Sequence, residues 1–345
     1  MKRTFLFALL FTLSSFICSA QNKFKVLALG FYNVENFFDT IDDPNKKDED
    51  FTPNGSYHNT PEVYAQKLYN MSKVFSLMGT DMTPDGPAII GLAELENDNV
   101  LKDIVVQPSI KDRNYKYVWH PTPDERGIST AMIYSPKYFT VLNSQPLRVP
   151  LEQLGQKRPT RDILFVSGVL AGDTVHVLVN HWPSKSGGEA ASAPGRKLAA
   201  KVGRHTIDSL LAIDPNAKIL LMGDLNDDPM SDAVIDVLKC TEDKERMKNT
   251  ELYNPWIKLY KKGIGTESYR GEWHLIDQMI LSYGFVKNQN NKWKYHSAKI
   301  FNEDFLINKI GKDKGLPHRS YSINQSWDNG FSDHFPVVMY MVEKL

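Results

Sequence analysis

The chain has 345 residues, 41% of them hydrophobic and 24% charged, and its 41 basic residues balance 41 acidic ones. This composition suits one large α/β domain or two small ones with an ample apolar core. The zero net charge argues against a protein that holds nucleic acid by bulk electrostatic attraction, because such proteins are strongly basic. If the protein acts on phosphate esters, the attraction must come from a local site and a bound cation.

The first 20 residues have the pattern of a secretory signal peptide. Two basic residues precede an apolar stretch, Phe5–Ile17, and Cys18-Ser19-Ala20 offers the small-x-small pattern of a cleavage site. The stretch is too short and wrongly flanked for a membrane-spanning helix. A lipoprotein signal around Cys18 is the weaker alternative, since bulky residues precede it where small ones are expected. We expect residues 1–20 to be removed and the protein to be secreted or periplasmic.

Residues 21–345 are predicted to form one domain, because no internal repeat, low-complexity tract or Gly/Ser-rich linker interrupts them. Cleavage after Ala20 leaves Cys240 as the single cysteine of the mature chain. An exported domain with one thiol has no internal disulfide, so its stability must come from burial of a large core. No obligate protein partner is evident from the sequence.

Apolar runs bounded by turn residues predict strands along the whole domain. The predicted strands are Phe24–Tyr32, Ala88–Leu92, Tyr115–Trp119, Ser129–Tyr134, Ile163–Leu170, Thr174–Val179, Lys218–Met222, Leu275–Ser282 and Pro336–Val342. Residues 61–78 predict a helix, since Leu68, Met71 and Phe75 recur at helical spacing between a proline and a terminal glycine. Further helices are predicted over Arg196–Ile213 and from about Ser231. Short strands with helices between groups of them predict two packed sheets with helical outer layers.

Short polar clusters lie at the ends of several of these strands. They are Asn33-Val34-Glu35-Asn36, Glu94-Leu95-Glu96-Asn97, Asn180-His181-Trp182, Asp224-Leu225-Asn226-Asp227, Asp277-Gln278 and Ser332-Asp333-His334. The pattern suggests one site assembled from the rim of a folded sheet, since strand ends commonly carry the sites of α/β folds. Carboxylate, amide and imidazole groups are the residue types needed to hold a divalent metal and a phosphate.

Phosphodiester hydrolysis explains why these residue types belong together. It needs a metal to polarise the phosphoryl group, a base or positioner for water, donors for the developing charge, and an acid for the leaving oxygen. Mg²⁺ takes only one or two protein carboxylates and keeps several waters, so a few acidic residues suffice. Taken singly, Glu94, Asn33 and Glu35 are weak indications, since a solvated loop or an ordinary strand end contains the same residues.

Two later clusters carry more specific expectations. Asp224 and Asn226 present an acceptor and an amide two residues apart after a buried strand, although a capped turn before a helix is an equally good interpretation. His181 at a strand end is a natural proton donor near neutral pH, and a surface histidine is the ordinary alternative. Lys185, in the following Gly-rich loop, is as consistent with a flexible linkage as with phosphate binding.

Asp277 and His334 are expected to pair. Asp277 falls within a predicted buried strand, where an unpaired carboxylate would be costly, so it needs a partner. His334 opens the last strand beside Asp333, which can orient an imidazole or share a metal with it. A carboxylate–imidazole pair would keep His334 cationic against a phosphate oxygen.

Read together and in this order, the motifs resemble the endonuclease/exonuclease/phosphatase superfamily, which has the deoxyribonuclease I-like fold. The resemblance covers roughly residues 24–345. It is similar in kind to secreted bacterial members that carry Asn-Val-Glu-Asn-Phe-Phe-Asp and Asn-His-Trp-Pro-Ser, present here from Asn33 and from Asn180. It implies a four-layered α/β sandwich, in which two mixed sheets pack back to back with helices outside and the site lies at one edge.

The resemblance implies a set of metal ligands and their neighbours. Glu94 corresponds to the main metal carboxylate, and Glu35 to an accessory ligand where many relatives have Asp. Asp333 would help bind metal or water, and Asn33 corresponds to the amide beside the metal and the scissile phosphate. The expected ion is Mg²⁺, with Mn²⁺ or Ca²⁺ as alternatives.

The remaining residues receive catalytic and substrate-binding roles from the same resemblance. Asp224 would align or deprotonate the attacking water, and Asn226 would hold a phosphate oxygen. His181 is the candidate acid at the leaving group, and His334, paired with Asp277, would contact the phosphate.

Two further assignments concern the surroundings of the scissile phosphate. Arg161 is expected to contact a neighbouring phosphate, as is Lys185. Asp124 is expected to orient His181.

The acidic segment Asp39–Asp50 is predicted to be a solvated loop, with a structural Ca²⁺ site as the alternative.

The leading functional interpretation is a secreted, divalent-metal-dependent phosphodiesterase, specifically an endonuclease with nucleic acid as its substrate. One alternative is an enzyme of the same fold for a lipid or small phosphate ester. The sequence lacks the exposed apolar hairpin of sphingomyelinases, and it has Ile276-Asp277-Gln278 where inositol-phosphate phosphatases tend to show Cys-Asp-Arg. A non-catalytic binding module ranks last, because it would be expected to have lost at least one site residue. The sequence does not choose between DNA and RNA, or between endonucleolytic and exonucleolytic action.

Overall fold

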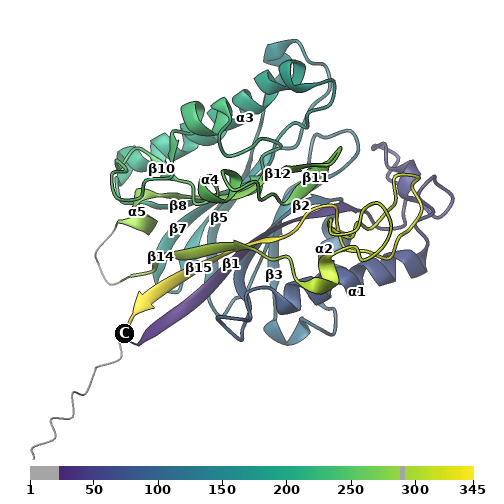
Figure 1. Cartoon of the computed structure of the whole chain (residues 1–345), viewed down its shortest axis with the longest axis horizontal. Coiled ribbons are helices and arrows are strands. Elements are labelled where there is room, and N and C mark those ends of the chain that lie inside the picture. The colour runs from purple at the N-terminus through teal and green to yellow at the C-terminus, as the bar shows by residue number, and fades with distance from the viewer. Residues whose placement is uncertain (1–22, 288–291) are drawn as a thin grey trace, which may run out of the picture.

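The computed structural model describes residues 23–287 and 292–345, so the expected signal peptide lies outside the described residues. Two β-sheets pack face to face, and the longer helices cover their outer faces (Figure 1). This is the four-layered α/β sandwich that the sequence predicted. In the part of the chain that is described, no helix is long and apolar enough to cross a membrane.

The first sheet contains both ends of the described chain. Its six strands, counted over the described residues, run in the order β14-β15-β1-β2-β4-β3. Their bounds are β1 Phe24–Phe37, β2 Pro87–Leu95, β3 Lys116–Trp119, β4 Ser129–Tyr134, β14 Lys294–Ile300 and β15 Val337–Lys344. The sheet is mixed, because β1 runs parallel to β2 and antiparallel to β15.

The second sheet is formed by the middle of the chain. Its seven strands in the described ranges run in the order β5-β6-β7-β8-β13-β10-β9. Their bounds are β5 Phe139–Leu147, β6 Ile163–Leu170, β7 Asp173–His181, β8 Lys218–Asp224, β9 Cys240–Thr241, β10 Leu252–Tyr253 and β13 Asp277–Ser282. A separate hairpin consists of β11 Glu267–Tyr269 and β12 Glu272–His274.

Helices form the two outer layers. α1 and α2 pack on the first sheet and α3 packs on the second (Figure 1). The α-helices are α1 Pro61–Leu77, α2 Asp98–Val105, α3 Glu189–Ile213, α4 Ile257–Tyr260 and α5 Tyr283–Val286, and the short helical turns are η1 Glu49–Phe51, η2 Lys111–Arg113, η3 Leu151–Leu154, η4 Ala233–Val237 and η5 Asp304–Leu306. Thr60 caps α1 by accepting a hydrogen bond from the Val63 amide, and Pro61 occupies the first turn, where its missing N–H costs nothing.

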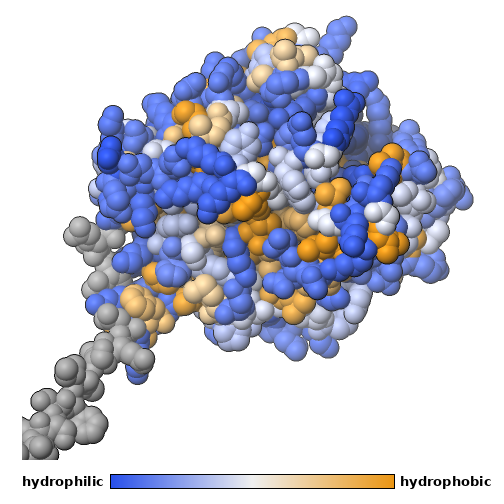
Figure 2. All heavy atoms as spheres, in the orientation of Figure 1, coloured by the Kyte–Doolittle hydropathy of each residue, from blue (hydrophilic) through white to orange (hydrophobic). Residues whose placement is uncertain are grey.

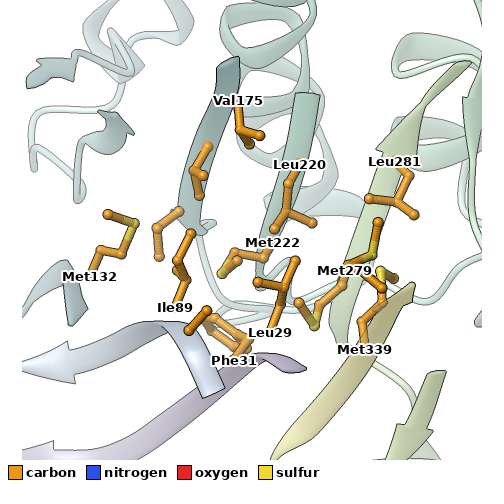
Figure 3. Packing of buried hydrophobic residues seen from close by; sticks show 14 of the residues in the cluster. Leu29, Phe31, Ile89, Met132, Val175, Leu220, Met222, Met279, Leu281 and Met339 are labelled. Carbon is orange, nitrogen blue, oxygen red and sulfur yellow. The ribbon is translucent and has the colours of Figure 1, made fainter. Parts of the chain in front are cut away.

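The main core fills the space between the two sheets. Leu29 and Phe31 of β1 point toward Leu220 and Met222 of β8, and all four side chains are buried (Figure 3). Alternate residues of a strand share a face, so each strand contributes every second side chain to this layer. Burying each large apolar side chain contributes about 1.5–3 kcal/mol, which allows the domain to be stable without a disulfide. The face in Figure 2 is mostly hydrophilic, with hydrophobic residues in separate patches.

Most predicted elements are confirmed, with shifts at their ends. α1 matches its prediction, whereas α3 begins at Glu189, earlier than the predicted Arg196. β1 continues to Phe37, so the first polar cluster lies inside a strand. The helix expected near Ser231 is a short π-helical turn. β5 was missed because its residues are largely exposed and form no apolar run.

The acidic segment after β1 is only partly solvated. Asp39 and Asp48 are buried, with Asp48 only 2% exposed. Phe51 stacks between Phe38 and Tyr57, at centroid distances of 4.1 and 4.2 Å. These rings hold the segment against the domain, so the prediction of a solvated loop is wrong for its two buried carboxylates.

Candidate active site

Three site residues come together because of the register of the second sheet. β7 and β8 are parallel and end at the same edge, with His181 paired to Asp224. β13 is antiparallel to β8 and begins at this edge, so Asp277 is also paired to Asp224. Local sequence places each residue at a strand end, and the pairing of the strands places all three side by side.

The first sheet adds its residues to the same point. The Asn33 side-chain amide of β1 donates to Asp224 Oδ2 at 3.0 Å, which joins the two sheets. Glu94 lies near the end of β2, and its Oε1 is 3.8 Å from His181 Nε2. That nitrogen is also 3.6 Å from Asp224 Oδ2. The site is therefore shared between the sheets at one edge of the sandwich.

Asp277 and His334 form the expected pair. Asp277 Oδ2 lies 2.7 Å from His334 Nδ1, and both side chains are buried. Burial alone would lower the pKa of His334, but the Asp277 carboxylate, followed by the charges of Asp333 and Asp224, raises this pKa well above its ordinary value. His334 is therefore a cation at neutral pH.

His181, in contrast to His334, is neutral. Burial, then the positive charges of Arg161, Arg126 and His334, lower the pKa of His181 well below its ordinary value, so its imidazole is neutral at neutral pH. Its Nδ1 is buried without a hydrogen-bond partner among the described residues. The expectation that Asp124 orients this ring is wrong.

Asp124 instead sits between two arginines. Its carboxylate lies 3.5 Å from Arg161 and 3.7 Å from Arg126. Arg161 is itself buried and donates to the Trp182 carbonyl at 2.8 Å. Asp124 therefore fixes the two arginines at the site, a role that no local sequence motif indicated.

The donor set fits a divalent metal. Asp224, Asp277 and His334 offer ligand atoms that all lie within 4.8 Å of one another. His334 is a cation held by Asp277, however, and a metal ligand must be a neutral imidazole, so the oxygens of Glu94, Asp224 and Asn33 are the better ligands.

The electrostatics of Asp224 support the same conclusion. Burial raises the pKa of Asp224 to about 7; the His334 cation opposes this rise, and the charges of Asp277 and Glu94 add to it. Among the described residues, no Lys or Arg nitrogen lies within 4.0 Å of the Glu94 or Asp224 carboxylate. A bound cation would supply the missing positive charge.

Asn226 and Asp333 lie next to this centre. The Asn226 amide N–H donates to Asp224 Oδ1 at 2.9 Å, and its side chain donates to the Trp182 carbonyl at 3.1 Å. Asp333 Oδ1 is 3.8 Å from His334 Nε2, while its Oδ2 accepts from Arg319 at 2.9 Å. Both residues are thus held at the cluster by contacts with its neighbours.

Glu35 is not brought to this centre. Its carboxylate accepts from the backbone amides of Ser320 at 2.7 Å and Tyr321 at 3.4 Å. Burial, then the charge of Asp333, raises the pKa of Glu35 to about 8. The φ angles of Glu35 and Asn36 are +45° and +49°, which breaks the alternation of β1 and turns this carboxylate toward the 319–321 segment. An accessory metal-ligand role for Glu35 has no support in this geometry.

The cluster opens into a cleft of about 750 Å³. Positive side chains from four segments line it, namely Arg126, Arg161, Lys185 and Arg270. Lys185 also lies 3.3 Å from Glu189 and 3.8 Å from Asp228, which keeps its ammonium at the rim.

Arg126 and the β11–β12 hairpin were missed as parts of the cleft. A signal for the hairpin exists, since Arg270-Gly271 lies between short alternating segments. Both turn residues have positive φ, +52° and +85°, as a tight two-residue hairpin requires. The bridge between Glu267 and His334 attaches the hairpin to the catalytic cluster.

Solved structures with this fold cover almost the whole chain. The D. rerio TDP2 complexed with single strand DNA product is 13% identical, with a TM-score of 0.53 and coverage of 92% of this chain and 98% of that one. An endonuclease/exonuclease/phosphatase family protein from Bacteroides thetaiotaomicron is 14% identical, with a TM-score of 0.54 and coverage of 94% and 100%. The human Nocturnin catalytic domain with bound sulfate anion is 12% identical, with a TM-score of 0.51 and coverage of 94% and 98%.

These structural similarities establish the fold, and the sequence comparison establishes the family. A search of curated protein sequences found no match. The model of the Endonuclease/Exonuclease/phosphatase family matches residues 28–344, which include every site residue named above. The chain belongs to the endonuclease/exonuclease/phosphatase family of metal-dependent phosphoric ester hydrolases.

Proposed function

We propose that this protein is an exported, divalent-metal-dependent endonuclease that hydrolyses phosphodiester bonds of nucleic acid. The observation that carries the proposal is the meeting of Glu94, Asp224 and the Asp277–His334 pair in one cleft that also presents four positive side chains. The carboxylates suit Mg²⁺, Mn²⁺ or Ca²⁺, and the positive side chains suit a chain of phosphates.

Each residue has a chemical task in this proposal. Glu94, with Asp224 or Asn33, would hold a divalent ion, which would supply positive charge to a phosphoryl oxygen. The His334 cation stabilises negative charge that develops on the phosphate. The Asp224 carboxylate, which accepts from the Asn33 side chain at 3.0 Å and from the Asn226 backbone at 2.9 Å, aligns or deprotonates the attacking water.

At the leaving group, the neutral state of His181 differs from the protonated state that the expected general acid would need. A neutral His181 can donate a hydrogen bond through Nε2–H to the leaving oxygen, but it is a weak source of a full proton. The general-acid role of His181 stays a prediction. The Asn226 side chain keeps one amide hydrogen available for a phosphate oxygen beyond its bond to Trp182.

Nucleic acid is favoured because the positive lining extends beyond a single phosphate. Arg126 and Arg161 line the cleft together with Lys185 and Arg270, which come from a separate loop and a separate hairpin. A substrate with several phosphates can contact these groups at once, whereas a small phosphate monoester cannot. Single strand DNA product and a sulfate anion were bound to the structurally similar D. rerio TDP2 and human Nocturnin, respectively.

The direct test is a substrate panel with the purified mature protein. We expect cleavage of plasmid DNA or single-stranded RNA in the presence of Mg²⁺, Mn²⁺ or Ca²⁺, and loss of cleavage after EDTA. Plasmid nicking separates endonucleolytic from exonucleolytic action. Cleavage of sphingomyelin or inositol phosphates in place of nucleic acid would overturn the substrate assignment, and chelator-resistant cleavage would overturn the metal mechanism.

Two variants test the residues. Glu94→Ala is expected to abolish detectable metal-dependent cleavage, and His181→Ala to slow turnover by ~100-fold or more. Glu152→Ala is the matched control, because it removes an exposed carboxylate outside the cleft lining. Full activity of both site variants, with folding verified by circular dichroism, would remove the proposed site.

A further inference from the structure

Three non-glycine residues near the ends of β1 and β2, beside the candidate metal site, have left-handed backbone conformations. The φ angles of Glu35, Asn36 and Glu94 are +45°, +49° and +67°. L-residues other than glycine are strained in this region, and the conformation persists only where the surrounding structure holds it. The strain lies where β1 and β2 end side by side, which is where Glu94 must be positioned.

A buried lysine of α1 contacts this strained segment. Lys67 is only 1% exposed, and its ammonium donates to the carbonyls of Glu35 and of Asn36, the latter at 3.1 Å. The same ammonium lies 5.6 Å from the ring centroid of Phe37 and 5.0 Å from that of Tyr321. Burying a charge is expensive unless its environment compensates, and here the two carbonyls, the two rings and the nearby carboxylates of Glu35, Glu94 and Asp333 do so.

The same segment is hydrogen-bonded to the Glu94 carboxylate, the proposed metal ligand. The Asn36 amide N–H donates to Glu94 Oε2 at 2.9 Å. This N–H belongs to the same planar peptide unit as the Glu35 carbonyl that accepts from Lys67. Fixing the carbonyl oxygen therefore fixes the direction of the N–H, and bonds on both sides of one peptide group strengthen each other.

We propose that Lys67 is a positioning residue for the metal site: through the Glu35–Asn36 peptide group it holds Glu94 in the orientation that binds the divalent cation. Glu94 Oε2 is engaged by Asn36, and Oε1 faces the site, 3.8 Å from His181 Nε2. The inference rests on the proposed function in one respect, that Glu94 is a metal ligand. Partners that orient a metal ligand typically contribute 10–100-fold to metal affinity.

The test measures metal affinity without any substrate. Lys67→Met keeps the apolar stem and removes the donor, and its Mn²⁺ affinity by calorimetry is expected to fall by about 10-fold or more. Lys73→Met is the matched control on the same helix, because the Lys73 ammonium lies over Phe305 and contacts no residue of the site. Thermal unfolding of each variant separates loss of the fold from loss of the metal.

A second variant gives a readout that a merely structural lysine would not change. Glycine adopts positive φ at no steric cost, so Asn36→Gly relieves part of the strain that Lys67 holds. The double variant Lys67→Met/Asn36→Gly is expected to recover part of the lost Mn²⁺ affinity. Lys67→Gln retains one donor group and is expected to show intermediate affinity, which provides the comparison if Lys67→Met does not fold.

Two outcomes overturn the positioning role. One is a folded Lys67→Met, or Lys67→Gln where Lys67→Met does not fold, that binds Mn²⁺ as tightly as the natural protein. The other is a Glu94→Ala variant with unchanged Mn²⁺ affinity. Failure of the natural protein to cleave any nucleic acid would instead contradict the proposed function and leave this affinity comparison intact.

Discussion

Two histidines in one cleft are held in different protonation states by their neighbours: His334 is a cation and His181 is neutral. Asp277 lies 2.7 Å from His334 and raises its pKa, whereas His181 is buried near arginines that lower its pKa. In the proposed mechanism the His334 cation faces the phosphate, and the neutral His181 ring donates a hydrogen bond. The two roles therefore follow from the side chains next to each ring, since both residues have the same intrinsic pKa.

The pH dependence of catalysis tests this difference. In the natural protein the His334 cation persists above the ordinary histidine pKa and is lost only as the pH rises through the raised value. In Asp277→Asn, burial is no longer opposed by this carboxylate, so the pKa of His334 falls. We expect the alkaline limb of the pH profile of kcat/KM to move to lower pH, with kcat reduced by ~100-fold or more.

Asp173→Asn is the control for this experiment. Asp173 is also buried and paired, with Lys218, but it does not line the cleft. It is expected to lower stability and to leave the alkaline limb in place. An NMR titration of the His334 ring gives the pKa directly, and an alkaline limb in the same position in Asp277→Asn would contradict the assignment.

Among the elements, the parallel pair β7–β8 places two groups of the candidate active site, His181 and Asp224. Gly223 precedes Asp224 and is paired with Asn180 in the neighbouring strand. A Cβ at Gly223 would lie 2.3 Å from the Asn180 carbonyl oxygen, which belongs to the backbone and cannot move away alone. The absence of a side chain here therefore sets the spacing between His181 and Asp224.

Two glycine substitutions are expected to have opposite effects. Gly223→Ala forces β7 and β8 apart, so we expect a loss of about 1–3 kcal/mol of stability and a clear fall in kcat/KM. Gly203→Ala lies in the interior of α3, where the nearest atom to the new Cβ is 3.7 Å away. Because alanine favours helix over glycine, Gly203→Ala should add about 0.5–1 kcal/mol and leave kcat/KM unchanged. Urea unfolding measures both, and equal effects at the two positions would be inconsistent with the close approach of the strands.

For the whole molecule, the proposed metal site connects the two halves of the sandwich. Glu94 and Asn33 belong to the first sheet and Asp224 to the second, and the main core lies between these sheets (Figure 3). A cation that binds these residues binds only the folded state, because unfolding separates them. Metal affinity is thereby coupled to global stability.

Thermal unfolding with and without metal measures this coupling. At a Mn²⁺ concentration of about 100 times Kd, the folded state should gain about 2.7 kcal/mol relative to EDTA-treated protein. In Glu94→Ala the metal-dependent increase in Tm should largely disappear, while Glu152→Ala should retain it. If the Tm of the natural protein is the same in Mn²⁺ and in EDTA, residues of the two sheets do not jointly bind the ion.

Local residue patterns were enough to predict the fold class and most of the residues that the structure brings together at the candidate site. The helical spacing of Leu68, Met71 and Phe75 and the apolar runs of the main strands depend on local side-chain patterns, which persist whatever the tertiary structure is. The order of polar clusters from Asn33 to His334 was equally visible, and the family match bears out the resemblance drawn from them.

The charge states of the site residues, their hydrogen-bond partners and the shape of the cleft could be read only from the folded structure. Positive φ angles turn Glu35 away from the metal site, and Asp124 binds Arg161 in place of His181. Lys67, a helix residue with no motif around it, reaches the strand that orients Glu94. These features depend on contacts between residues distant in the chain and on burial, and a linear pattern of residue types carries neither.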